Sequence, residues 1–216
     1  MRIVVGLFKK IVLVQLILGG LLFESGLWTN VVSDPTGAGT SVIAFCFLAY
    51  LYAYLDLSSY TDMAIGTSRL LGYKVVENFN WPILANNLAE FWRRWHMSLS
   101  GWCFRNIYFP VLMSTKASYV AMITTMTAVG LWHDMSLSWL TWGLYHGVGL
   151  ALLAGKKNRN PKHDSGSAFD WLHNVGSIVI TNVFVAAGFA FVSINDYPVA
   201  WEVFVGFFLS PIRELL

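Results

Sequence analysis

Charged residues are scarce in this sequence. They make up 12% of its 216 residues, against about 25% in an ordinary soluble domain. Hydrophobic residues make up 56%, more than a core of this size can bury, which excludes a water-soluble globular protein. The net charge of +2 is too small for a nucleic-acid-binding surface, so we expect the lipid bilayer as a partner and no nucleic acid.

Several chemical signatures are also missing. The only two cysteines, Cys46 and Cys103, lie in separate apolar contexts, which excludes a disulfide framework and a C-x-x-C motif. No H-x-x-x-H or H-E-x-x-H pattern occurs, so we expect no bound metal. Without a G-x-S-x-G elbow, a G-x-G-x-x-G fingerprint or a P-loop, the α/β-hydrolases and the common nucleotide-binding folds are excluded.

Long apolar stretches are what the sequence has instead. Each stretch is bounded by polar or turn residues and is long enough to be a candidate membrane helix. The best candidates are residues 3–23, 40–57, 117–132, 136–155 and 171–193, with 197–210 as a shorter sixth. We therefore predict an all-α, multi-pass membrane protein, with about five or six membrane helices in a single domain spanning residues 1–216. The basic segment 156–167 is expected on the cytoplasmic side.

Residues 58–114 have a different composition, mixing apolar, aromatic and charged side chains. This mixture predicts short helices that lie at the membrane interface or re-enter the bilayer. Asn87 followed by Glu90 resembles a capping box at a helix start. On that helix, Glu90 can pair with Arg93 or Arg94.

Helical spacing predicts two further groupings. Phe91, Trp95 and Trp102 fall at i, i+4 and i+11 on the helix predicted after Asn87, which places them on one face. Asp62 and Arg69 are seven residues apart, so they would share a face and join a buried polar network with a structural role.

Two histidines and an aspartate stand out in "GLWHDMSLSWLTWGLYHG", residues 130–147. A helix from Lys116 to His133 rises roughly 25 Å, less than the ~30 Å of the hydrocarbon layer. The tip of a helical hairpin, between residues 132 and 136, should then stop inside the membrane. Irregular backbone at that depth must line a wet cavity or be buried in protein.

His133 at this tip has two interpretations. It could be a buried side chain that hydrogen-bonds a neighbouring helix, or a general base, because a neutral imidazole suits that role near neutral pH. Asp134 could orient its ring. His146 lies with Trp139 and Trp142 on one helix face, and the favoured interpretation is a histidine whose hydrogen bonds are satisfied at a helix contact.

Four ordered blocks carry a family resemblance: "DMAIG", "ENFN", "EFWRRWHMSLS" and "GLWHDMSLSWLTWGLYHG". With them the chain resembles the membrane-bound O-acyltransferase (MBOAT) family, in particular the bacterial branch with proteins of alginate O-acetylation and teichoic acid D-alanylation. The opening "GLFKK", residues 6–10, also resembles a segment internal to that family.

The resemblance implies an enzyme that moves an acyl group from a thioester to a hydroxyl. It implies that His133 is the catalytic histidine and His96 a second one, both lining a funnel that nearly perforates the membrane. Residues beside these histidines are expected to contact the substrates: Trp92, Arg94, Trp132 and Asp134.

The expected reaction partners follow from the same resemblance. We expect no bound cofactor. The donor, as co-substrate, would be acetyl-CoA or an acylated carrier protein, and acetyl is the favoured acyl group. The acceptor would be a cell-envelope polymer such as a polysaccharide, with a periplasmic acyltransferase as an expected partner. The expected location is the bacterial inner membrane.

Two departures from the family keep other functions open. The family usually has glycine where this chain has Asp134, and its members are about twice as long, so the chain resembles their C-terminal part. These departures favour a truncated, non-catalytic scaffold subunit as the alternative. A further alternative is a small transporter with His133, Asp134 and Asp62 as a proton relay.

Overall fold

The computed structural model describes residues 1–154 and 168–213. Within these ranges every regular element is a helix, which confirms the all-α prediction. The predicted cytoplasmic segment 156–167 lies outside the described residues. The chain divides into two compact units. Unit 1 comprises Met1–Asn78 with Ala186–Leu216, and unit 2 comprises Phe79–Val185.

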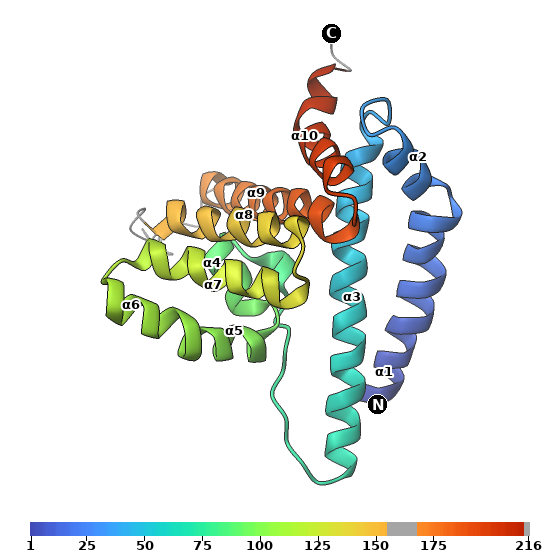
Figure 1. Cartoon of the computed structure of the whole chain (residues 1–216). Helices are drawn as coiled ribbons and strands as arrows, with labels where there is room; N and C mark the ends of the chain where they lie inside the picture. The colour runs from blue at the N-terminus through green and yellow to red at the C-terminus, as the bar shows by residue number, and fades with distance from the viewer. Residues whose placement is uncertain (155–167, 214–216) are drawn as a thin grey trace. The chain divides into compact units, whose positions relative to one another are not determined.

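Unit 1 is built around one long helix. Its elements are α1 (Arg2–Phe8), the π-helix η1 (Lys9–Glu24), α2 (Leu27–Ser33), α3 (Ser41–Leu70) and α10 (Tyr197–Arg213). Figure 1 shows α1 and η1 lying alongside α3. Gly26, with a φ of 80°, separates η1 from α2, because glycine adopts this left-handed conformation without a steric penalty.

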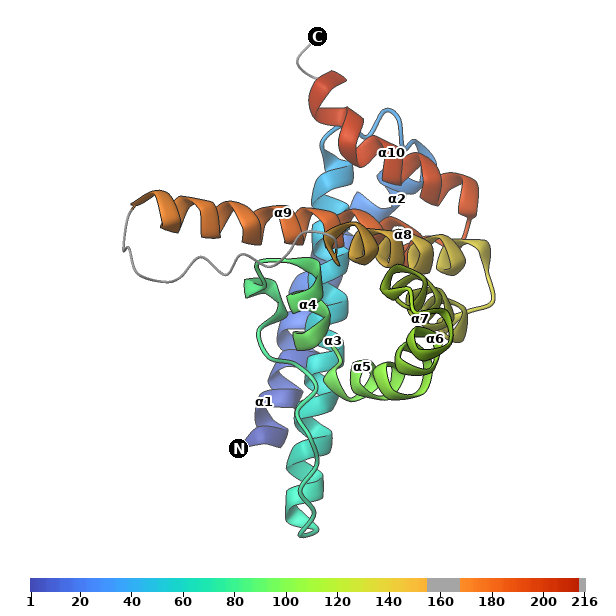
Figure 2. The same ribbon diagram turned by 90° about the vertical axis from the view of Figure 1, so that its left-hand side faces the viewer.

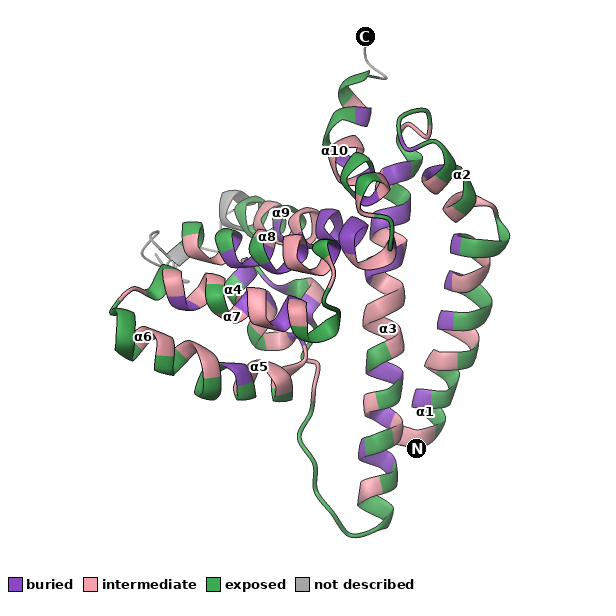
Figure 3. Ribbon diagram, in the orientation of Figure 1, coloured by how far each residue is buried: buried purple, intermediate pink, exposed green. Residues whose placement is uncertain are grey.

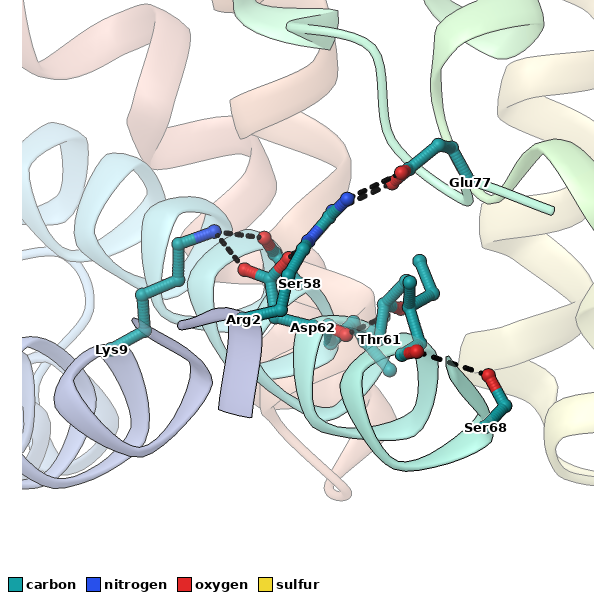
Figure 4. Close-up of polar contacts among 9 residues, drawn as sticks. Arg2, Lys9, Ser58, Thr61, Asp62, Ser68 and Glu77 are labelled. Carbon is teal, nitrogen blue, oxygen red and sulfur yellow. Dashed lines mark hydrogen bonds and ion pairs between the residues drawn. The ribbon is translucent and has the colours of Figure 1, made fainter. Parts of the chain in front are cut away.

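The helix α3 is longer than the second apolar stretch suggested, since it continues from residue 57 through the polar segment to Leu70. Asp62 lies on this extension and is buried. Its carboxylate accepts hydrogen bonds from Arg2 Nε at 2.9 Å and Lys9 Nζ at 2.8 Å (Figure 4). The donors to Asp62 thus come from α1 and η1, and not from Arg69, which was expected to share its face and network.

These contacts form a polar network that joins α1 and η1 to α3. Lys9 Nζ also donates to Ser58 Oγ at 2.8 Å, and Arg2 pairs with Glu77 through its two terminal nitrogens, Nη1 and Nη2. Lone charges in apolar helices are costly unless they pair. The structural role predicted for Asp62 is therefore supported.

Unit 2 consists of shorter helices. They are the 3₁₀ turn η2 (Pro82–Leu84), α4 (Leu88–Arg94), α5 (Met97–Cys103), the π-helical turn η3 (Phe104–Tyr108), α6 (Phe109–Thr115), α7 (Ser118–His133) and α8 (Leu137–Ala154). α5, η3 and α6 follow one another without a gap as one helical run. The helix α9 (Ala168–Ser193) carries residues of both units. Figure 2 shows the run α5–α6 with α7 and α8.

The predicted hairpin is present as α7 and α8, joined by residues 134–136. Glycines allow its two helices to pack closely. A Cβ added at Gly143 would lie 2.6 Å from the backbone oxygen of Met126, and one at Gly147 would lie 2.8 Å from the Cα of Ile123. The G-x-x-x-G pattern of the sequence thus marks a helix contact, as such patterns do in membrane proteins.

Three helical segments in the described residues are long and apolar enough to cross a membrane: Arg2–Ser33, Ser41–Leu70 and Trp171–Ser193. This is fewer than the five or six predicted, partly because α7 and α10 have only 16 and 17 residues. Figure 3 shows that η1 buries residues toward α3 and exposes much of the rest. Such exposed apolar surface fits a multi-pass membrane protein.

Candidate active site

The start of α4 confirms the predicted capping arrangement. Asn87 Oδ1 accepts a hydrogen bond from Glu90 N at 2.8 Å. Glu90 pairs with Arg94 at 2.5 Å, one of the two partners predicted for it. Arg94 Nη1 also lies 3.5 Å from the carbonyl oxygen of Trp81. Arg94 is therefore engaged within the protein.

The helix does not continue as predicted, because it ends at Arg94. His96 adopts a φ of 44°, a left-handed conformation that costs free energy in any residue other than glycine. The break separates the predicted apolar face: Trp95 is buried and stacks on Phe91 with centroids 5.4 Å apart, whereas Trp102 is 53% exposed. Strained backbone of this kind often occurs at functional sites.

His133 is the last residue of α7. Its ring stacks on Trp139 with centroids 4.6 Å apart, and it contacts Trp132 at 4.8 Å and Trp142 at 6.2 Å, both edge to face. The residue is otherwise exposed. His133 is therefore held by aromatic rings at the hairpin tip and keeps an open side.

The two motif histidines lie in the same unit, and His96 influences the pKa of His133. Partial burial lowers the pKa of His133 below 6.5, and the nearby His96 lowers this pKa further. Partial burial also lowers the pKa of His96 below 6.5. Burial favours the neutral imidazole because a charged ring loses hydration. Both rings are therefore suited to accept a proton at neutral pH.

Buried polar groups gather around these histidines. Trp92, Trp142 and His146 contact one another, with ring centroids 4.9 to 5.8 Å apart. Both indole N–H groups and both His146 nitrogens are buried without a hydrogen-bond partner among the described residues, and so is His96 Nδ1. The interpretation of His146 as a satisfied helix-contact residue is therefore not supported.

The remaining predicted site residues flank this cluster. Trp132 is 66% exposed beside His133. Asp134 is exposed and has no ion-pair partner among the described residues. Trp139 and Trp142, which hold the His133 ring, were not predicted as site residues. Their spacing of three along α8, on the face of His146, was the signal available in the sequence.

No three side chains of His, Cys, Asp or Glu gather as metal ligands within the described residues. The polar groups that do gather are imidazoles and indole N–H groups, which handle protons and bind oxygen atoms. The arrangement is chemically suited to deprotonating a hydroxyl group and to stabilising charge on an oxygen.

Comparison with known proteins connects this arrangement to a family. The chain is 33% identical over 181 residues to the probable alginate O-acetylase AlgI of Pseudomonas aeruginosa, covering 82% of the chain and 33% of that protein. It is 34% identical over 150 residues to the teichoic acid D-alanyltransferase of Bacillus subtilis, covering 64% of the chain and 38% of that protein.

A third relative is the peptidoglycan O-acetyltransferase of Helicobacter pylori, 32% identical over 152 residues, which are 62% of the chain and 29% of that protein. The chain thus spans about a third of the length of these curated relatives. The sequence profile of the MBOAT, membrane-bound O-acyltransferase family, matches residues 1–157. With most of its length matched, the chain belongs to the membrane-bound O-acyltransferase family.

Proposed function

We propose that unit 2 carries the reacting centre of an O-acyltransferase and that His133 is its general base. The observation that carries the proposal is the exposed His133 ring held against Trp132 and Trp139 at the hairpin tip, in the same unit as His96. The pKa of each of the two histidines is lowered. A base must be neutral to accept a proton, and lowering the pKa keeps it neutral at physiological pH.

The reaction can be written with its protons accounted for. An acceptor hydroxyl attacks the carbonyl carbon of an acyl thioester while His133 takes the hydroxyl proton. The tetrahedral intermediate then expels the thiolate, and the His133 imidazolium returns the proton to sulfur. An ester and a free thiol result.

The names of the relatives guide the choice of substrates. Two are named for O-acetyl transfer to alginate or peptidoglycan and one for D-alanyl transfer to teichoic acid. We therefore propose an acetyl group as cargo and acetyl-CoA or an acylated carrier protein as donor. The proposed acceptor is a hydroxyl of a cell-envelope polysaccharide, reached directly or through a periplasmic acyltransferase, and the proposed location is the bacterial inner membrane.

In this proposal the residues around the two histidines contact the substrates. Trp92 and Trp132 would supply apolar surface, and Asp134 would face the entering acceptor. Arg94 has the weaker case, because Glu90 already engages its guanidinium group.

Asp134, which stands where the family usually has glycine, favours a second candidate, a scaffold subunit without activity. The transporter alternative is weaker, because Asp62 is already occupied by two cations within unit 1.

One experiment distinguishes the acyltransferase from the inactive scaffold subunit. Membranes containing the chain are incubated with a radiolabelled acetyl thioester and a polysaccharide acceptor. We expect His133→Ala to slow transfer by about 10²–10⁴-fold, the usual contribution of a general base. The matched control is His173→Ala, since His173 is an exposed histidine of α9. Equal rates for His133→Ala and the unchanged chain would exclude His133 as the base, and no transfer by any form would favour the scaffold.

A further inference from the structure

A pocket of about 510 Å³ lies in unit 2, and its lining includes Trp92 but neither His133 nor His96. Residues of α4, α5, η3, α7 and α8 line it. Its inner wall is apolar and rich in methionine: Met97, Met122, Met126 and Val129. Pockets of 300–1,000 Å³ are the usual size for small-molecule sites, and methionine adapts to flexible apolar ligands.

Two arginines give the pocket its charge. Arg93 and Arg105 both line it, and neither forms an ion pair with a described residue. A Cβ at Gly101 would lie 3.5 Å from Arg105 Nη1, in ordinary van der Waals contact, so the Arg105 guanidinium group lies directly beside Gly101. The described lining contains no acidic residue. The pocket therefore combines an apolar wall with two unpaired positive charges.

The helical run that borders the pocket has the character of a membrane-interface helix. Trp102, Phe104 and Phe109 on η3 and its neighbours are each about half exposed, at 53%, 55% and 49%. Aromatic side chains gather at the level of lipid headgroups, and basic residues nearby attract anionic lipids. The molecules that combine a negative charge with apolar chains at this level are anionic phospholipids.

We propose that this pocket binds one anionic phospholipid. Its phosphate would lie between Arg93 and Arg105, and an acyl chain would pack against Met122 and Met126. A soluble phosphate-bearing thiol has the same charge but lacks the long apolar chain that this wall fits. The proposal does not depend on the role of His133.

The test is lipid binding by the purified chain in detergent, followed by native mass spectrometry. Phosphatidylglycerol is titrated against phosphatidylcholine with the same acyl chains. We expect one phosphatidylglycerol per chain, bound more tightly than phosphatidylcholine. Replacing both arginines, Arg93→Gln with Arg105→Gln, should weaken phosphatidylglycerol binding about 30-fold, since each basic residue contributes about 1 kcal/mol. Phosphatidylcholine binding should not change.

Two further variants separate charge from shape. Lys116→Gln removes a positive charge beyond the end of α6, away from the described lining, and should leave binding unchanged. Gly101→Leu should weaken binding by displacing the Arg105 guanidinium group. Equal binding of the two lipids, or no effect of the double arginine variant, would overturn the proposal. Displacement of phosphatidylglycerol by equimolar coenzyme A would overturn it too, by identifying a soluble occupant.

Discussion

The two units treat their polar groups in opposite ways. In unit 1, Asp62 is buried between Arg2 and Lys9, so every charge of the cluster has a partner. In unit 2, His146 and the indoles of Trp92 and Trp142 are buried without a partner among the described residues. A buried polar group that lacks a partner costs free energy. This cost is consistent with the reacting centre proposed for unit 2, where polar groups remain available for substrate or water.

The comparison predicts that the Asp62 network acts on stability. Asp62→Asn should lower the free energy of unfolding by about 2–3 kcal/mol. This is less than the 3–5 kcal/mol for a fully buried pair, because the side chains of Arg2 and Lys9 are 34% and 25% exposed. Denaturant titration in detergent measures the change. Acyl transfer per folded molecule should stay the same, and Arg69→Gln serves as the control.

A loss of transfer in Asp62→Asn without any loss of stability would contradict this assignment. It would instead revive the interpretation in which Asp62 relays protons.

His146 should show the opposite behaviour. His146→Phe removes two unpartnered nitrogens and keeps a ring of similar shape, so the free energy of unfolding should stay equal or rise by up to about 1 kcal/mol. Transfer should slow, because the ring contacts both Trp92 and Trp142. Parallel unfolding and transfer assays check this. Destabilisation with unchanged transfer would show instead that His146 is a structural contact.

The third prediction concerns pH. Because burial and the nearby His96 lower the pKa of His133, the neutral base persists below pH 6.5. The transfer rate should be flat at higher pH and fall only in acid, with its half-maximal point below 6.5. In His96→Gln, the half-maximal pH of the normalised pH–rate profile should rise only slightly, because burial lowers the pKa of His133 more than His96 does. A half-maximal point above 6.5 in the unchanged chain would argue against His133 as the titrating group.

Local patterns predicted several features well. Asn87 and Glu90 marked the start of α4 because capping depends only on neighbouring residues. Asp134 and Ser136, just after His133, marked the hairpin tip, because polar residues that interrupt an apolar stretch are also a local signal. These predictions needed no knowledge of distant parts of the chain.

Features that depend on distant partners were not predictable. The helix α3 continues past residue 57 through Asp62, whose charge is neutralised by Arg2 and Lys9, some 50 to 60 residues away. The break at His96 involves neither glycine nor proline, so no local signal announced it. The motif resemblance singled out His96 and His133, but the aromatic support from Trp139 and Trp142 became visible only in the folded unit.

The most direct test of the central claim is a double-mutant cycle on acyl transfer. His96→Ala, His133→Ala and the double variant are compared with the unchanged chain under one set of conditions. Residues that serve one reacting centre have strongly non-additive effects. We predict that the double variant is no slower than His133→Ala alone. If the two single losses multiply in the double variant, the histidines act independently and do not form one reacting centre.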